Sequence, residues 1–100
     1  MGTYVMLTRL SPEALARHGT VEKLNAKVEE RIREECPNVK WVGNYAVLGR
    51  CDYLDIFEAP DTETATKVAL LVRSIGHAST ETWVATPWER FLRMAQGLKV

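Results

Sequence analysis

The sequence predicts an α+β domain with the element order βαββαβ and a short helix after the last strand. Four segments have the alternation or the β-branched and aromatic content of strands, and two long segments between them have helical periodicity. A four-residue break, Gly49-Arg50-Cys51-Asp52, separates two strand-like runs and is typical of a hairpin. Because crossover connections are right-handed, both main helices should lie on one face of a four-stranded antiparallel sheet. This is the ferredoxin-like arrangement.

The first strand is predicted over residues 3–10. Tyr4 and Met6 fall on one side of it, and Val5 and Leu7 fall on the other, so both faces carry apolar side chains. The Ser-Pro-Glu sequence that follows offers a hydroxyl N-cap, a proline at the first helical position and an acid near the positive end of the helix dipole. A helix should therefore begin directly after the strand.

A longer and clearer helix is predicted from an N-cap at Thr20 to Glu35. Its apolar residues recur at spacings of three and four, which gives one buried stripe, and charged residues occupy the other faces. The stripe consists of Val21, Leu24, Val28 and Ile32. Cys36 should end the helix, because a residue that precedes proline is disfavoured in the helical region.

Two strands are predicted on either side of the glycine break, over residues 39–48 and 52–58. In the first, Gly43 indicates a bulge or a close approach of another backbone. Strict alternation places Trp41, Gly43, Tyr45 and Val47 on one face. In the second, Leu54 and Ile56 point one way, while Tyr53, Asp55 and Phe57 point the other. The two runs form a hairpin.

The last third of the chain predicts a helix, a strand and a terminal helix. Asp61 caps the helix, which has the stripe Ala65, Val68, Ala69, Val72 and Ile75 and ends at Gly76. Residues 78–86 alternate and predict the fourth strand. Thr86-Pro87-Trp88-Glu89 combines a capping box with a proline at the first helical position. A short helix should follow it.

A sheet with helices on one side should be polar on its other side if the chain is monomeric. With Val5, Leu7, Leu54 and Ile56 assigned to the helix side, the open face would carry Tyr4, Met6, Tyr45, Phe57 and Trp41. Such an aromatic surface needs a cover. We expect a homodimer or larger homo-oligomer, in which two sheets meet in a dimeric α+β barrel and the terminal helix clasps the partner. In the opposite case, the terminal helix folds over the sheet of its own chain.

A family resemblance rests on four stretches of the chain. They are Gly49-Arg50-Cys51-Asp52, Tyr45 followed by Leu48-Gly49-Arg50, Glu58-Ala59-Pro60-Asp61, and Thr80-Glu81-Thr82. Over residues 3–92 the chain resembles the GYD domain family of small bacterial and archaeal proteins, named for a Gly-x-Tyr-Asp sequence between the second and third strands. Cys51 stands where the family has tyrosine, so no role of that tyrosine carries over. The resemblance implies one GYD-like domain over residues 1–100 with a fold related to dimeric α+β barrels, and it implies no particular activity.

Composition argues against several classes of partner. Thirteen Lys and Arg offset thirteen Asp and Glu, so the chain has no net positive field to attract nucleic acid or an anionic membrane. No stretch approaches the roughly 20 apolar residues of a bilayer span, and no basic signal-peptide region opens the chain. A cytoplasmic location is the default. In a reducing compartment, Cys36 and Cys51 are expected to be small semi-buried residues, with no disulfide between them.

Three residues are candidates for acid/base chemistry. Asp52 follows the glycine turn, and Arg50 beside it could hold an anion, although aspartate at a turn usually binds backbone amides. Asp55 shares a face with aromatic residues and would be a buried carboxylate in need of partners. His77 precedes the fourth strand at a barrel end. Neither His18 nor His77 has ligand spacing, so we expect no metal and no cofactor.

The residues around Asp55 predict a pocket with an apolar body and a few convergent polar groups. The expected ligand-binding residues are Tyr4, Met6, Tyr45, Arg50, Phe57, Thr80 and Thr82. The leading hypothesis is a homo-oligomeric small-molecule-binding or accessory protein with its cavity between the sheets of the dimeric barrel. One alternative is a cofactor-independent enzyme of the oxygenase, isomerase or decarboxylase type, with Asp52, Asp55 or His77 as base. Another is a structural assembly protein.

Overall fold

The computed structural model describes residues 1–13, 16, 19–76 and 78–98. The elements are β1 (Gly2–Arg9), α2 (Val21–Glu35), β2 (Lys40–Ala46), β3 (Tyr53–Ala59), α3 (Thr62–Gly76), β4 (Ser79–Ala85) and α4 (Trp88–Gln96). Of the helix expected directly after β1, Pro12, Glu13 and Ala16 are described, and their backbone is helical. The predicted order of strands and helices is confirmed, and the element boundaries differ from the prediction by only a few residues.

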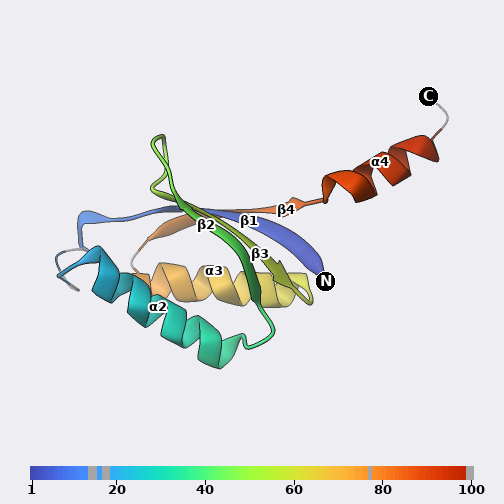
Figure 1. Cartoon of the computed structure of the whole chain (residues 1–100). Helices are drawn as coiled ribbons and strands as arrows, with labels where there is room; N and C mark the ends of the chain where they lie inside the picture. The colour runs from blue at the N-terminus through green and yellow to red at the C-terminus, as the bar shows by residue number, and fades with distance from the viewer. Residues whose placement is uncertain (14–15, 17–18, 77, 99–100) are drawn as a thin grey trace.

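The four strands form one antiparallel sheet in the order β2-β3-β1-β4. Figure 1 shows α2 and α3 side by side beneath this sheet, while the other face of the sheet is uncovered. The predicted α+β class and the placement of both main helices on one face are therefore confirmed. α4 lies apart, at the far end of β4 (Figure 1).

The helix caps predicted at Thr20 and Asp61 are confirmed. The Thr20 hydroxyl accepts a hydrogen bond from the Lys23 backbone N–H at 3.2 Å and starts α2. Asp61 accepts bonds from the backbone N–H and the hydroxyl of Thr64, at 2.8 and 2.7 Å, and starts α3. The capping box predicted for α4 is wrong, because Pro87 is the N-cap and no side chain bonds to the end of that helix. Pro87 occupies the N-cap position in an extended conformation, and α4 starts there without a hydrogen bond from a capping side chain.

The assignment of the two sheet faces is wrong and has to be reversed. Tyr4 and Met6 of β1 and Phe57 of β3 point toward the helices and are buried with Ile32 and Val68 in the core. Because paired residues of neighbouring strands share a face, the side chains of β1 and β3 that lie together were predicted correctly, although their side of the sheet was not. Alternation alone cannot choose the side when both faces of a strand are apolar.

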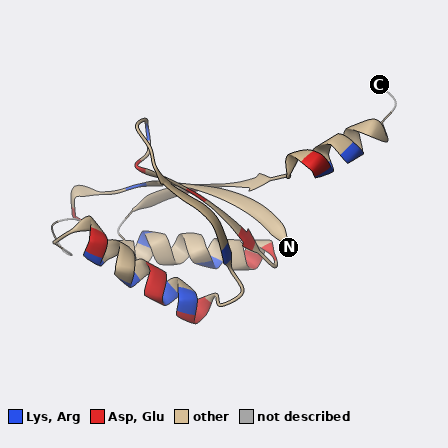
Figure 2. Cartoon of the chain, viewed as in Figure 1, with Lys and Arg blue, Asp and Glu red and all other residues tan. Residues whose placement is uncertain are grey.

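The uncovered face carries the other half of each strand. Its apolar residues include Val5, Leu7, Tyr45, Leu54, Ile56 and Trp83, as the strand pairing requires. The same face also carries four charged residues, Arg9, Lys40, Glu58 and Glu81. These charges distinguish the solvent side from the core side. Figure 2 shows that most of the remaining charged positions lie on the helices. This face is mixed in polarity, which differs from the aromatic surface that we expected.

The predicted irregularity at Gly43 is confirmed as a bulge. The pairing of β2 with β3 shifts between Trp41, which pairs with Phe57, and Gly43, which pairs with Ile56. A Cβ atom at Gly43 would lie 2.8 Å from the ring of Tyr45, so a side chain at this position would displace that ring. From Gly43 onward, each side chain of β2 points to the face opposite to the one that strict alternation predicts.

α4 has no buried residue, although it is strongly amphipathic. Trp88, Phe91, Leu92 and Met94 are exposed, and the rings of Trp88 and Phe91 stack at 5.2 Å. The helix does not fold back over its own sheet (Figure 1). No helix in the described part of the chain is long and apolar enough to cross a bilayer.

Candidate functional site

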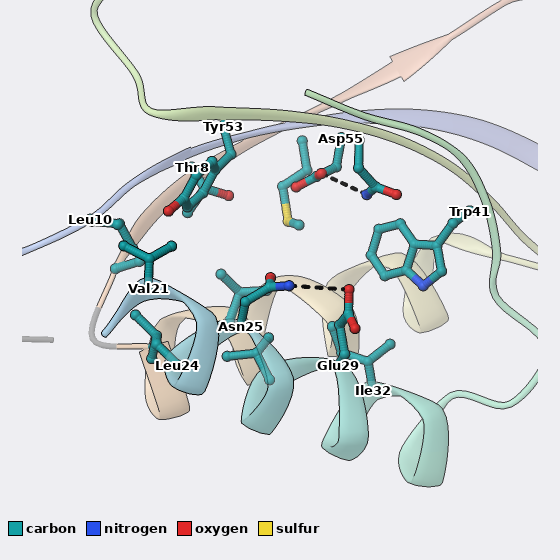
Figure 3. A pocket seen from close by; sticks show the side chains of 16 residues that line it. Thr8, Leu10, Val21, Leu24, Asn25, Glu29, Ile32, Trp41, Tyr53 and Asp55 are labelled. Carbon is teal, nitrogen blue, oxygen red and sulfur yellow. Dashed lines mark hydrogen bonds between the residues drawn. The ribbon is translucent and has the colours of Figure 1, made fainter. Parts of the chain in front are cut away.

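A pocket lies between α2 and the core side of the sheet (Figure 3). Its volume is about 590 Å³ when the open solvent at its mouth is included. Its walls are mainly apolar and aromatic, and its polar residues are Thr8, Asn25, Glu29, Asn44, Tyr53 and Asp55. A hollow apolar body with a few convergent polar groups is the usual composition of a small-molecule site.

The pocket exists because α2 packs mainly against α3 and leaves space below β2 and β3. Leu24 and Ile32 of the apolar stripe are buried and form the base of the pocket. Asn25 and Glu29 lie one helical position beyond that stripe and point toward the sheet (Figure 3). The amide nitrogen Nδ2 of Asn25 donates to Oε1 of Glu29 at 3.3 Å. The helix therefore presents a polar edge to the mouth of the pocket.

Asp55 is the polar residue that β3 contributes from the opposite wall. The Nδ2 atom of Asn44 donates a hydrogen bond of 2.7 Å to Oδ1 of Asp55. This bond depends on the bulge in β2, because the register shift places Asn44 directly opposite Asp55 on the core side. Without the shift, the register set by Trp41 and Phe57 would have placed Gly43 opposite Asp55. The bulge thus selects which residue of β2 reaches the carboxylate.

Burial in the pocket raises the pKa of Asp55 above its ordinary value, since desolvation disfavours the charged form. The hydrogen bond from Asn44 acts in the opposite direction, and the charge of Glu29 adds to the increase. Burial also raises the pKa of the Tyr53 hydroxyl, with further contributions from the charges of Asp52 and Asp55. A titratable group with a shifted pKa in a concave site is a candidate for function.

Two of the predicted site residues, Met6 and Asp55, line this pocket. Tyr4 and Phe57 are buried beside it in the core, where their rings stack at 5.6 Å. Tyr45 was assigned to the same face, but it pairs with Leu54 on the uncovered face and is 57% exposed. The bulge is the physical reason for that error.

The remaining predicted residues lie away from the pocket. Arg50 forms an exposed ion pair with Glu81 at 3.3 Å near the hairpin loop. Thr80 accepts a hydrogen bond from Nε of Arg73 at 2.8 Å. Among the described residues, the buried hydroxyl of Thr82 has no hydrogen-bond partner. None of these three side chains faces the pocket below α2.

Asp52 ties the hairpin loop to the end of β1. Its Oδ2 atom accepts the Leu10 backbone N–H at 2.8 Å, and its own N–H donates to the Thr8 carbonyl at 2.9 Å. This is the turn chemistry that aspartate commonly supplies. The Asp52 carboxylate therefore has a structural role, as the acceptor of a backbone N–H group. His18 and His77 lie outside the described residues.

Sequence reasoning missed Asn25, Glu29 and Asn44, and it did not assign Trp41 to the site. The two α2 residues carried a signal, because they flank the apolar stripe on the side of Leu24 and Val28. Asn44 carried none without knowledge of the bulge position. Across the described ranges, no group of three or more His, Cys, Asp or Glu side chains could hold a metal ion. Cys36 and Cys51 are both free.

Comparisons with known proteins give one family and one fold. The family model of the GYD domain matches residues 4–95. No curated protein matches the chain. Among solved structures, the chain is similar to a de novo designed protein with a ferredoxin fold, determined by solution NMR. The two share 14% identity and a TM-score of 0.51, over 87% of this chain and 86% of the designed one. At that identity the likeness shows the fold alone.

Proposed function

The chain belongs to the GYD domain family, and we propose that it is a homo-oligomeric protein that binds a small, partly apolar molecule in the pocket between α2 and the sheet. The observation that carries this proposal is the pocket itself, with Asp55 on one wall and Asn25 and Glu29 on the other. We had expected a cavity between the sheets of two chains, and we now propose that the ligand binds between the sheet and α2 of one chain. The binding function remains the leading hypothesis.

The cost of placing a carboxylate in this pocket supports a binding role. Burial of Asp55 is unfavourable for its charged form, and Asn44 is the one described residue whose side chain donates to it. An ionised carboxylate can accept several hydrogen bonds. A bound molecule with donor groups would supply the bonds that the protein does not. The Asp55 carboxylate can therefore bond to donor groups of a molecule held in the pocket.

A second copy of the chain is proposed to cover the open sheet face and α4. The chain has 7072 Å² of accessible surface, whereas a compact monomer of its mass would have about 5,700 Å². Its radius of gyration is 15.3 Å, against about 13 Å for a compact domain of this length. The excess area, roughly 1,400 Å², exceeds the roughly 800 Å² per partner that a stable interface buries.

The distribution of this exposed surface favours two-fold symmetry. The apolar side of α4 and the apolar residues of the open sheet face belong to the same chain but do not contact each other. In a two-fold dimer, α4 of each copy can lie on the open face of the other, and both surfaces are then covered at once.

Binding is tested with a pair of variants on α2. Val28→Trp fills the pocket, because Val28 lines it, whereas Ala26→Trp adds the same indole on an exposed position outside the lining. A metabolite library is screened by thermal shift, and the natively purified protein is examined by mass spectrometry for a retained molecule. We expect ligands that stabilise the wild type and Ala26→Trp but not Val28→Trp. Equal responses of the two variants would contradict the proposal, as would a library with no hit together with an empty purified protein.

Oligomerisation is tested by light scattering after size exclusion at micromolar concentration. We expect a molar mass of twice the 11.3 kDa of one chain. Leu92→Asp should shift the mass toward the monomer, because Leu92 lies on the apolar side of α4, whereas Arg90→Gln changes the charge by the same amount on the opposite side of the helix and should not. A wild type that runs as a clean monomer would refute the oligomer.

The raised pKa of Asp55 favours one second candidate, a cofactor-independent enzyme that uses this carboxyl group as an acid or base. For a ligand found in the screen, Asp55→Asn should still bind the uncharged form of that ligand. The same substitution should abolish any turnover of the ligand. If turnover survives this substitution, Asp55 is not the catalytic group.

A further inference from the structure

We infer that the molecule bound in the pocket below α2 is a cation, an amine with a flat apolar body. This inference rests on the proposed binding function and specifies its ligand class. It comes from the charges, the hydrogen-bonding groups and the rings that line the pocket.

The lining is negatively charged on both walls. Asp55 stands on β3 and Glu29 on α2, and no Lys or Arg is among the lining residues that the structure describes. At the mouth, the adjoining hollow adds Glu22 and again no basic residue. A cleft lined by one sign of charge attracts ligands of the opposite sign and repels those of its own sign. An anionic ligand is therefore disfavoured.

None of the basic residues of α2 lines the pocket, and Arg33 lines a separate hollow beside Glu29 and Trp41. Arg31 is paired with Glu34 and Glu35 along the helix, at 3.7 and 3.2 Å, and it does not line the pocket. Figure 2 shows charges of both signs along α2. Of these, the acidic residues Glu22 and Glu29 reach the pocket or its mouth. Within the pocket lining itself, the charge that α2 contributes is therefore negative.

The free hydrogen-bonding capacity of the pocket consists mainly of acceptors. Asn44 and Asn25 direct their amide N–H groups to Asp55 and Glu29, each to one carboxylate oxygen. The second oxygen of each carboxylate receives no bond from any described residue. Because an ionised carboxylate can only accept, these oxygens are open to a donor group of a bound molecule. An ammonium group has three donors and also the matching charge.

Two aromatic rings complete the match. Trp41 closes one end of the pocket, and Tyr53 lies at the sheet wall near Thr8 (Figure 3). The face of an indole attracts a cation within about 6 Å, and a flat apolar group stacks against it. The pKa of Asp55, which burial and the charge of Glu29 both raise, should fall when a cation enters. Asn44 from β2 and Tyr53 from β3 are the other polar residues beside the Asp55 carboxylate.

The inference is tested with three probes of similar shape and different charge: benzylammonium, benzyl alcohol and benzoate. Binding to the full chain is followed at neutral pH by two-dimensional NMR, with the indole signal of Trp41 and the side-chain amides of Asn25 and Asn44 as reporters. We expect benzylammonium to bind at least about tenfold more tightly than the alcohol, as one charge-assisted bond implies, and benzoate not to saturate.

Near-isosteric variants identify the groups responsible. Asp55→Asn and Glu29→Gln should each reduce the preference for the ammonium probe over the alcohol by several-fold. Glu30→Gln removes the same charge from a position on α2 outside the pocket and should leave the preference unchanged. If Glu30→Gln has the same effect as Glu29→Gln, the preference reflects overall charge and the inference fails.

The outcome also separates this inference from the broader binding proposal. Equal affinities for ammonium and alcohol, or tighter binding of benzoate, would overturn the cationic ligand and leave a pocket that binds small molecules. If none of the three probes shifts the reporter signals, the cationic ligand is also overturned. The binding proposal then depends on its own library screen, in which neutral or anionic ligands sensitive to Val28→Trp would sustain it.

Discussion

Two threonines of β4 should respond in opposite ways to the same substitution. Thr80 and Thr82 lie two residues apart on the same face of the strand. The buried hydroxyl of Thr82 has no partner among the described residues, whereas the hydroxyl of Thr80 accepts Nε of Arg73 at 2.8 Å. Valine has the shape of threonine without the hydroxyl. Strand propensity changes equally at the two sites, so the difference between them isolates the hydrogen bond.

Thr82→Val should stabilise the chain by about 1 kcal/mol, because the desolvation penalty of an unpaired hydroxyl is removed. Thr80→Val should destabilise it by about 1 kcal/mol, the usual worth of a hydrogen bond near the surface. For a domain of this length each change corresponds to a shift of roughly 4–8 °C in Tm, upward for Thr82 and downward for Thr80. Urea titrations followed by circular dichroism give both free energies of unfolding. If Thr82→Val is as destabilising as Thr80→Val, the Thr82 hydroxyl has a partner and the reasoning is wrong.

Three further predictions concern the core, the hairpin loop and the pocket carboxylate. Phe57→Ala should cost about 3–5 kcal/mol of unfolding free energy in a urea titration, because a fully buried ring is removed; a loss below 1 kcal/mol would contradict its place in the core. Asp52→Ala should cost about 1 kcal/mol by leaving the Leu10 N–H without its acceptor, and the probe affinities should stay unchanged by NMR. Asp55→Asn should be more stable than the wild type at pH 7, because the raised pKa means that the folded state disfavours the charge. That advantage should shrink as the pH falls toward the ordinary aspartate pKa of 3.8, and thermal melts across this range would count against the prediction if the wild type were the more stable protein at pH 7.

The element order and most helix starts could be predicted because their causes are local. Thr20 and Asp61 bind backbone groups three residues away, and proline after Cys36 ends α2 whatever surrounds it. The bulge could be predicted as well, because a glycine inside a strand is itself a local signal of such an irregularity. Pro87 is the exception, since a capping motif was present in the sequence and the helix begins without using it.

The side of the sheet that meets the helices could not be obtained from alternation. Tyr4 and Val5 point to opposite faces of β1, and both are apolar. The charges on the Val5 side, Arg9 and Glu81 among them, were the available signal. The site was only partly predictable for a related reason. Asp55 was found because a carboxylate among aromatic residues is unusual, whereas its partner Asn44 depends on a register shift of one residue.

The central position of β1 has a consequence for how the chain is made. This strand pairs with β3 and with β4, and Thr3 stands opposite Ala85. At synthesis rates of about 5–20 residues per second, roughly 4–16 s separate these two residues on the ribosome. During that interval one edge of β1 is unpaired, and contacts of such long sequence separation form slowly even in the finished chain. The pairing of β1 with β4 is therefore expected to form last. In a nascent or stalled chain, the unpaired edge of β1 is the edge most open to pairing with another molecule.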